Sequence, residues 1–188
     1  MRILPSPLNS QRGAALITGL IFVVMLTIIG VTATRMASLE ERMAGNMRDR
    51  SLAMQAAELT LRDAERDITN AATGSARGIT GITAFSTDCG ASTTATTQDD
   101  GLCYNGSGGF ASPIWTTASM TGAPSVVIGA FTGAAALPFV SAQPRYLIEG
   151  FRKQVPGSGS DTFFYRITTR AQGANPNTVV WLQEVIKP

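Results

Sequence analysis

The sequence has no histidine, and it has only two lysines and two cysteines among its 188 residues. Histidine is the commonest general base and the commonest zinc ligand, so neither kind of site has its usual donor here. We therefore predict no metal site and no cofactor. The chain also lacks the G-x-S-x-G and S-x-x-K motifs of serine nucleophiles, so a membrane-anchored enzyme is the weakest functional hypothesis. A paired-carboxylate site would have to use the few acids of the C-terminal part: Asp88, Asp99, Asp100, Glu149, Asp161 and Glu184.

Charge is also sparse, because Asp, Glu, Lys and Arg together make up 15% of the residues and the formal net charge is +2. Arg2 and Arg12 lie before a long apolar run, and the other 13 basic side chains equal the 13 acidic ones in number. A neutral body offers no basic patch to phosphates, so we predict no nucleic-acid partner. Apolar residues make up 44% of the chain, which is enough for a packed core.

Residues 13–34 form an uncharged run of 22 residues, GAALITGLIFVVMLTIIGVTAT. A helix of about 20 apolar residues spans the hydrocarbon core of a bilayer. Arg2 and Arg12 precede the run and no acid does, so the positive-inside rule places residues 1–12 in the cytoplasm. The remainder of the chain would then lie outside the cytoplasm.

Three interpretations of this N-terminus compete. A secretory signal peptide has an apolar region of about 7–15 residues, which is shorter than the run here. A plain single-pass anchor fits the length. The third interpretation rests on residues 11–17, QRGAALI, where a short basic leader ends in glycine directly before the uncharged helix. This arrangement resembles the type III signal that a prepilin peptidase cuts on the cytoplasmic face. The resemblance implies a leader peptide at residues 1–13, cleavage after Gly13, and N-methylation of Ala14 as the new N-terminus.

Several blocks of sequence support the third interpretation. They are LEERMAGNMRDR (39–50), AMQAAE (53–58), LRDAE (61–65), FYRITTRA (164–171) and TVVWLQ (178–183). These blocks resemble the PilX family of minor pilins from type IV pili, at both ends of the chain. Residues 70–140 carry no resemblance that we can use.

The resemblance implies a structural assembly protein with the α+β fold of type IV pilins, in which a long N-terminal helix packs on a small antiparallel β-sheet. A minor pilin of this kind primes filament assembly, remains at or near the tip, and supports twitching motility and surface attachment. Its implied partners are other minor pilins, the major pilin, the prepilin peptidase and a tip adhesin. It would sit in the inner membrane with a periplasmic head before it joins the extracellular pilus. The main alternative is a minor pseudopilin of a type II secretion system, although the block at 39–50 favours the pilus.

One position departs from the family pattern. Most pilins have a glutamate at the fifth residue of the mature chain, which is thought to neutralise the terminal ammonium of a neighbouring subunit inside the filament. Here that position is Thr18, which offers a hydrogen bond but no charge. A buried unpaired ammonium would be costly. Either threonine is simply tolerated in the membrane helix, or this subunit never sits beneath another one, as at a tip.

Helical periodicity continues beyond the apolar run and predicts one helix over residues 14–68, about 80 Å long. Residues 14–34 would be its membrane or filament-core half, and residues 35–68 an amphipathic spine for the head. Gly45 and Asn46 weaken the helix locally and leave a break into two helices open.

An apolar stripe runs along the second half of this helix. We interpret its methionines as core residues, because methionine fills gaps in packed interiors, and not as a metal site. The other faces carry charged residues, Asp63 among them, which we expect to be solvated. The stripe consists of Met36, Leu39, Met43, Met47, Met54, Ala57, Leu61, Ala64 and Ile68.

Residues 69–188 are predicted to form the head. Residues 70–123 are rich in Thr, Ser, Gly and Ala, and they fit the variable loop that pilins place between helix and sheet. Residues 124–188 contain short alternating or β-branched runs separated by turn residues, which predict antiparallel strands. One face of this sheet would pack on the apolar stripe and give the α+β fold. The expected strands are 125–131, which is the weakest, 145–151, 162–171 and 178–185.

Cys89 and Cys103 are the only cysteines, and both lie in a segment predicted to be outside the cytoplasm. A disulfide is therefore expected, and it would stabilise the fold by about 3 kcal/mol in the chain-entropy model. Asp99, Asp100 and Gly101 lie inside the closed loop. Without further oxygen ligands at alternate positions, they indicate a turn and not a calcium site.

Overall fold

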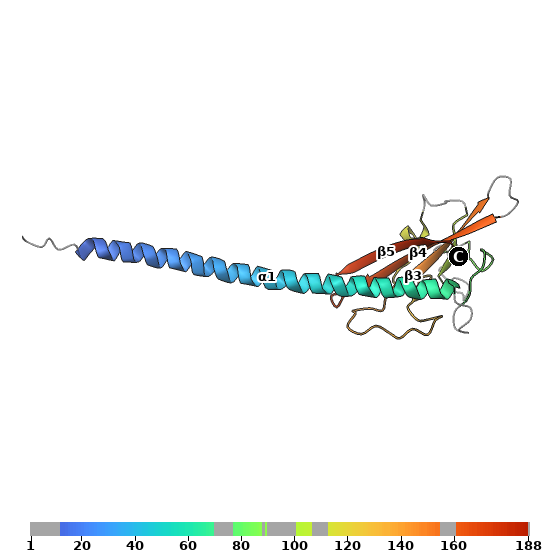
Figure 1. The fold of residues 1–188 in the computed structure, drawn as a ribbon, viewed down its shortest axis with the longest axis horizontal. Helices are drawn as coiled ribbons and strands as arrows, with labels where there is room; N and C mark the ends of the chain where they lie inside the picture. The colour runs from blue at the N-terminus through green and yellow to red at the C-terminus, as the bar shows by residue number, and fades with distance from the viewer. Residues whose placement is uncertain are drawn as a thin grey trace, which may run out of the picture. The chain divides into compact units, whose positions relative to one another are not determined.

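The computed structural model describes residues 12–69, 77–87, 89, 101–106, 113–154 and 161–187. One long helix comes first, and the strands follow it (Figure 1). The chain divides into two compact units, Met1–Asn46 and Met47–Pro188. The chain therefore has the α+β class that the resemblance implied.

Helix α1, Arg12–Thr69, is a single α-helix of 58 residues. It contains no proline, and glycine at its weakest stretch, Gly45-Asn46, costs only about 1 kcal/mol relative to alanine. The long helix is thus confirmed, and the break that the sequence left open does not occur. The helix already includes Gly13, whereas residues 1–11 lie outside the described residues, so the leader peptide stays a prediction.

The first half of α1 is long and apolar enough to cross a membrane, with a mean hydropathy of 2.7. Its side chains between residues 13 and 34 are all exposed in the isolated chain. Water disfavours an apolar surface of this extent. The segment therefore needs lipid or partner helices around it.

The five strands of the second unit form one sheet with the order β1-β3-β4-β5, and β2 also pairs with β3. The three long strands confirm the predicted ones to within three residues at each end, whereas the weakest predicted strand is reduced to two residues. Pairing is antiparallel between β2 and β3, β3 and β4, and β4 and β5. The strands are β1 Leu102–Tyr104, β2 Val126–Val127, β3 Arg145–Gln154, β4 Asp161–Gln172 and β5 Val179–Ile186.

The sheet is mixed and not wholly antiparallel, because β1 pairs parallel with β3. β1 lies inside residues 70–123, which we predicted as a loop, so that part of the prediction is wrong. Three residues are too few to show alternation, which explains why the sequence carries no strand signal there. β1 is held by long-range contacts instead, since Leu102 lies opposite Ile148 and the Ile148 N–H donates to the carbonyl of Gly101 at 2.7 Å.

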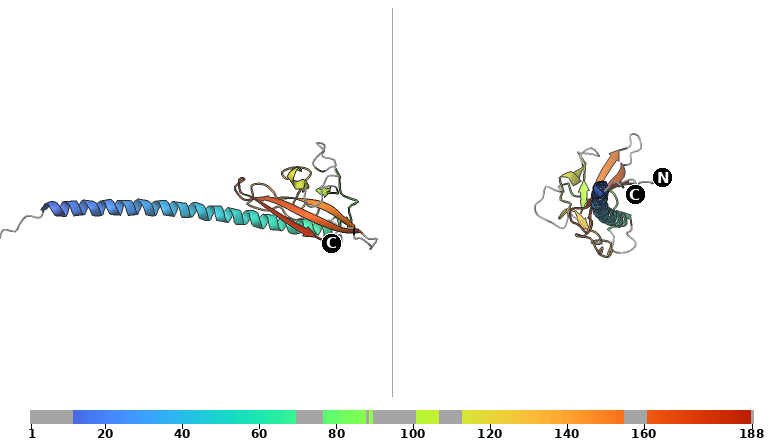
Figure 2. Two further views of the ribbon diagram at one scale, coloured as in Figure 1. Left: turned by 90° about the horizontal axis from the view of Figure 1, so that it is seen from above. Right: turned by 90° about the vertical axis from the view of Figure 1, so that its left-hand side faces the viewer.

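One face of the sheet packs against the C-terminal part of α1 (Figure 2). Ala64 and Ile68 from the end of the helix contact Tyr146, Ile148 and Ile167 from the strands. A second cluster joins the helix to β4 and β5 farther along. The helix residues buried in this interface are Ala53, Ala56, Ala57, Thr60, Asp63, Ala64, Asp67 and Ile68.

The predicted apolar stripe forms only part of this interface. Its last residues are buried, but Met47 is 71% exposed and Met54 is also exposed, so their interpretation as core residues is wrong for the isolated chain. Asp63, which we placed on a solvated face, is only 2% exposed. The sheet approaches the helix closely, so small side chains and not long methionines fit between the two layers.

The opposite face of the sheet is also covered. Leu147 on β3 contacts Cys103, Ala118 and Met120, and the short 3-10 helix η3, Ile114–Thr116, lies against the same cluster. The strands β3 and β4 are therefore buried on both faces near their middle, with α1 on one side and loop segments on the other.

Candidate functional site

The predicted processing and assembly residues lie together at the start of α1. Gly13, Ala14 and Thr18 all belong to the helix and are exposed. The hydroxyl of Thr18 lies 3.1 Å from the carbonyl oxygen of Ala14 and 3.0 Å from that of Ala15, and it donates to them. The polar group of this side chain is thereby satisfied inside its own helix, as a threonine in apolar surroundings requires.

Farther along α1, the buried carboxylate of Asp67 holds the chain that follows the helix. The guanidinium of Arg77 donates to Asp67, with Nε 3.0 Å from Oδ1, and the phenol of Tyr146 donates at 2.9 Å. Burial raises the pKa of the Tyr146 phenol and the charge of Asp67 raises it further, so the phenol remains a donor at neutral pH. The Arg77 guanidinium also lies 3.9 Å from the ring centroid of Phe131.

One turn earlier, Asp63 holds the loop after β2. The N–H of Gly129 donates to Asp63 Oδ2 at 2.7 Å, and the hydroxyl of Thr132 donates to Oδ1. Gly129 has a φ of 79°, and a Cβ there would collide with the backbone of Ala134. Only glycine therefore fits this approach.

Asp49 binds the turn between β4 and β5. Its Oδ1 accepts hydrogen bonds from the backbone N–H groups of Ala174 at 2.6 Å and Asn175 at 3.2 Å. A hydrogen bond from the Thr178 side chain, opposed by burial and assisted by these two amides, holds the pKa of Asp49 below its ordinary value. A Cβ at Gly173 would collide with this carboxylate, so a side chain there would displace Asp49 from the turn.

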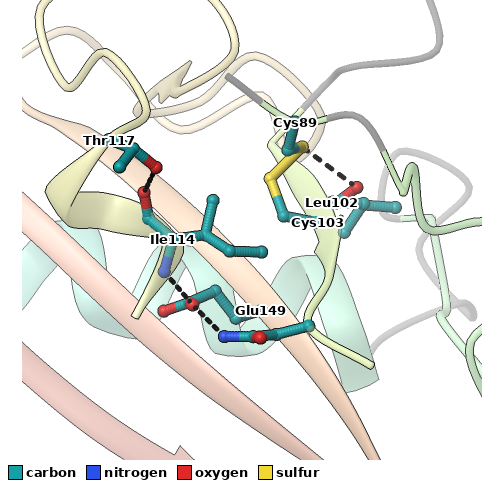
Figure 3. The surroundings of a disulfide bond; sticks show 7 residues. Cys89, Leu102, Cys103, Ile114, Thr117 and Glu149 are labelled. Atoms are coloured by element: carbon teal, nitrogen blue, oxygen red, sulfur yellow. Dashed lines mark hydrogen bonds between the residues drawn. A yellow bond between two sulfur atoms is a disulfide. The ribbon is translucent and has the colours of Figure 1, made fainter. Parts of the chain in front are cut away.

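The face of the sheet away from the helix contains a buried ion pair. Glu149 on β3 and Arg166 opposite it on β4 are both buried, and Arg166 donates from Nε to Oε2 at 2.8 Å and from Nη2 to Oε1 at 2.9 Å. Glu149 Oε1 also accepts the backbone N–H of Ile114 at 2.6 Å and the amide of Asn105 at 3.2 Å (Figure 3). The ion pair therefore fastens two loop segments to the sheet.

The expected disulfide between Cys89 and Cys103 is present and lies near Glu149 (Figure 3). Cys103 is fully buried on β1, and in the β1–β3 register it lies opposite Glu149. The bridge therefore links residue 89 to strand β1 of the sheet.

The predicted turn inside the closed loop is described only in part. Gly101 has a φ of 75°, as expected for a glycine at a turn. Asp99 and Asp100 lie outside the described residues.

A pair of carboxyl groups joins α1 to β5. Burial raises the pKa of Glu184, and the charge of Glu65 and a hydrogen bond with it raise that pKa further. Two acids that share a site in this way bind a proton more readily than either would alone.

The side chains described above form hydrogen bonds and ion pairs within the chain. No three His, Cys, Asp or Glu residues in the described part of the chain are grouped so that they could hold a metal ion. Glu149 is engaged in the buried ion pair, and Asp161 forms a surface ion pair with Arg152 at 2.6 Å. The remaining candidate acids, apart from Glu184, lie outside the described residues: Asp88, Asp99 and Asp100.

The buried hydrogen bonds and ion pairs of Asp63, Asp67 and Glu149 were not predicted from the sequence. For the two helix acids the available signal was their spacing of four, which puts both on one helix face with Ala56 and Thr60. Glu149 carried a different signal, because it interrupts the apolar run from Tyr146 to Phe151 and aligns with an arginine on the next strand.

Two family models match the chain. One is described as PilX N-terminal and matches residues 12–62, and the other is described as type IV pilus assembly protein PilX C-term and matches residues 85–188. No curated protein and no solved structure matches the chain. The two matched regions include most of α1, every strand and both cysteines.

Proposed function

Because the chain belongs to the PilX family of type IV pilus assembly proteins, we propose that it is a minor pilin that primes pilus assembly and remains at or near the filament tip. In this role it supports twitching motility and surface attachment. It acts by binding and not by catalysis, and its partners are other minor pilins, the major pilin and a tip adhesin.

The observation that carries the proposal is the combination of both family matches with a helix that serves two environments. Residues 13–34 of α1 are uncharged and exposed, whereas residues 53–68 of the same helix are buried under the sheet. A soluble or simply secreted protein has no use for such an exposed apolar segment. A pilin uses it first as an inner-membrane anchor, with the head in the periplasm, and then as the packing surface inside the extracellular filament.

Processing by a prepilin peptidase is the first step of this function. We propose cleavage after Gly13 and N-methylation of Ala14. The test is to express the full chain with and without a prepilin peptidase and to determine the mature N-terminus by mass spectrometry. We expect a chain that begins at methylated Ala14 only when the peptidase is present. An intact N-terminus, or cleavage near Ala33, would overturn the filament function and leave an ordinary anchored or secreted protein.

Thr18 supports the position at the tip. A subunit with a charged neighbour packed against this position would need a carboxylate there, because an unpaired ammonium in an apolar bundle is costly. The hydroxyl of Thr18 is already engaged by its own helix. A subunit that never sits beneath another one has no such need.

A minor pseudopilin of a type II secretion system is the alternative within the same architecture. The two functions separate in a strain that lacks the chain, since loss of surface pili with normal secretion supports the pilus. Normal pili with impaired secretion would support the pseudopilus. The matches to pilus assembly models favour the first outcome.

A further inference from the structure

Strand β5, Val179–Ile186, lies at one edge of the sheet (Figure 1). Among the described residues it pairs only with β4. An edge strand presents a row of unpaired backbone donors and acceptors that can pair with another chain. Proteins usually protect such an edge with charged residues, proline or a bulge. β5 contains neither lysine nor proline, and its one charged residue, Glu184, lies against Glu65 on α1.

The pairing register identifies which backbone groups of β5 are not used by β4. Gly173 N–H donates to the carbonyl of Thr178 at 2.9 Å at the start of the β4–β5 ladder. In an antiparallel pair the residues that bond to the partner strand alternate, so residues 180, 182, 184 and 186 bond to β4. The N–H and C=O groups of the residues between them point away from β4: Val179, Trp181, Gln183 and Val185.

The same four residues carry the exposed side chains of β5. Their neighbours Val180 and Leu182 contact the buried helix cluster, so these four lie on the face away from α1. Trp181 is 42% exposed and Val185 is 50% exposed, although both are large apolar residues. A strand laid along this edge would meet backbone groups that β4 does not use and exposed apolar side chains together.

Trp181 is also held in place before any partner arrives. Its ring centroid lies 5.4 Å from that of Trp115, and the guanidinium of Arg170 lies 5.9 Å from the Trp181 ring centroid. Tryptophan and arginine are the residues most enriched among those that dominate the energy of protein interfaces. Holding them in one arrangement lowers the entropy lost on binding.

We propose that β5 receives an extended segment of a partner protein, which adds to the sheet as a further strand and places alternate apolar side chains beside Trp181 and Val185. The backbone groups that β4 does not use select a strand, and the exposed Trp181 and Val185 select apolar side chains. The identification of the partner as another pilus component rests on the proposed function, whereas the mode of binding does not.

A second copy of this chain fits less well. Two β5 strands that pair with each other would bring the same side chains together, so the two Arg170 guanidinium groups, one beside each Trp181, would lie on the same face of the joined sheet. An apolar segment of a different protein adds no second charge there.

The test places a photo-reactive amino acid at Val185 of the full chain in cells that assemble pili. A second chain carries the same group at Glu58, which is exposed on α1, as a matched control. We expect Val185, and not Glu58, to cross-link to one pilus protein, at a segment with apolar residues at alternate positions. Cross-linking only to a second copy, only to lipid or to nothing overturns the proposal.

A backbone variant separates strand addition from simple apolar contact. Gln183→Pro removes one outward N–H that β4 does not use, so the sheet keeps its internal ladder. We expect the cross-link yield from Val185 to fall about fivefold while the head stays folded. Its melting temperature should fall slightly, because the variant also loses the hydrogen bond from Gln183 Nε2 to the Thr168 hydroxyl at 3.0 Å. Val179→Lys, which adds a charge to the edge without touching the backbone, should lower the yield as well and serves if the proline variant does not fold. An unchanged yield in a folded variant overturns the proposal.

The cross-linking experiment and the processing test have distinguishable negative outcomes. A chain that is cleaved after Gly13 but shows no cross-link at Val185 keeps its place in the pilus and loses only the strand addition. A cross-link from the edge to a protein outside the pilus, in a chain that is not cleaved, keeps the binding mode and overturns the proposed function.

Discussion

Glu65 on α1 and Glu184 on β5 place two carboxyl groups against each other in a head that otherwise pairs its buried acids with donors. Because the pKa of Glu184 is raised in the folded chain, the folded state binds the proton more tightly than the unfolded state. The stability from this group is present below the ordinary pKa of 4.5 and is lost as the pH rises through the raised pKa. The contact between Glu65 and Glu184 should therefore stabilise the head less at neutral pH than in mild acid.

We expect Glu184→Gln to stabilise the head at pH 7 and to have little effect at pH 4. Glutamine keeps the size and hydrogen bonding of the side chain and removes the repulsion from Glu65. The gain should stay below about 1 kcal/mol, because solvent screens this partly exposed pair. Thermal unfolding of the two chains at both pH values measures it, with Glu58→Gln as a control at an exposed helix position. Equal melting temperatures at pH 7 would contradict the prediction.

Glu149 is a different kind of acid, because its charge is fully enclosed with that of Arg166. Glu149→Gln leaves a buried guanidinium without its counter-charge, so we expect a loss of about 3 kcal/mol in the free energy of unfolding. Asp161→Asn is the matched control, since it removes one partner of the exposed ion pair with Arg152 and should cost below about 1 kcal/mol. Chemical denaturation of both variants gives the comparison. Similar losses of stability in the two variants would mean that the buried ion pair of Glu149 stabilises the head no more than the exposed ion pair of Asp161.

Among the secondary-structure elements, the long helix and the three long strands could be predicted from sequence because each repeats a pattern over eight or more residues. β1 could not, since it has three residues and forms only where β3 and the disulfide hold it. The buried face of α1 was predicted in part, because periodicity identifies apolar positions but not how closely a sheet approaches. Alanines and two aspartates fill that interface, and the methionines stay outside.

The site residues also divide into those that could be predicted from the sequence and those that could not. The disulfide could be predicted because only two cysteines exist and both lie in the head. Gly13, Ala14 and Thr18 were identified by their position relative to the apolar run, and their roles remain predictions. Asp49 could not be found, because its partners lie in a turn more than a hundred residues away.

The disulfide should matter most for the layer that covers the outer face of the sheet. We expect the double variant Cys89→Ser/Cys103→Ser to lose about 3 kcal/mol of stability, since the unfolded chain is no longer constrained. Hydrogen exchange should rise first at residues 101–106 and 113–120, which include the residues packed around the bridge, and later in β4. The parent chain under reducing conditions is the control and should show the same pattern. Loss of protection in β4 before these two segments would contradict this assignment.

For the chain as a whole, the division into two units follows from one helix with two kinds of surface. The unit from residue 47 onward buries its helix under the sheet and is held by Asp49, Asp63 and Asp67. The apolar half before it has no such partners in the described residues and is exposed throughout. The contacts that hold the head together therefore do not involve the apolar half. Under the proposed function, the head would fold before assembly and the apolar half would pass from lipid to neighbouring helices.

Substitutions at Thr18 test whether this residue determines the position of the subunit in the filament. We expect Thr18→Glu to let the subunit enter the shaft of the filament, because a carboxylate there can neutralise the ammonium of a neighbour in apolar surroundings. Thr18→Val is the matched control, since it keeps the shape of the side chain and adds no charge. Immunogold labelling along purified pili measures the distribution, which should spread from the tip into the shaft only for the glutamate variant.

The same distribution for both variants would mean that residue 18 does not determine position. Threonine would then be simply a residue that the apolar helix tolerates, with its hydroxyl satisfied by the carbonyls of Ala14 and Ala15. The position at the tip would in that case have to be set by contacts of the head. The exposed edge of β5 would be the first place to look for them, because a strand added there binds one partner and leaves the helix free.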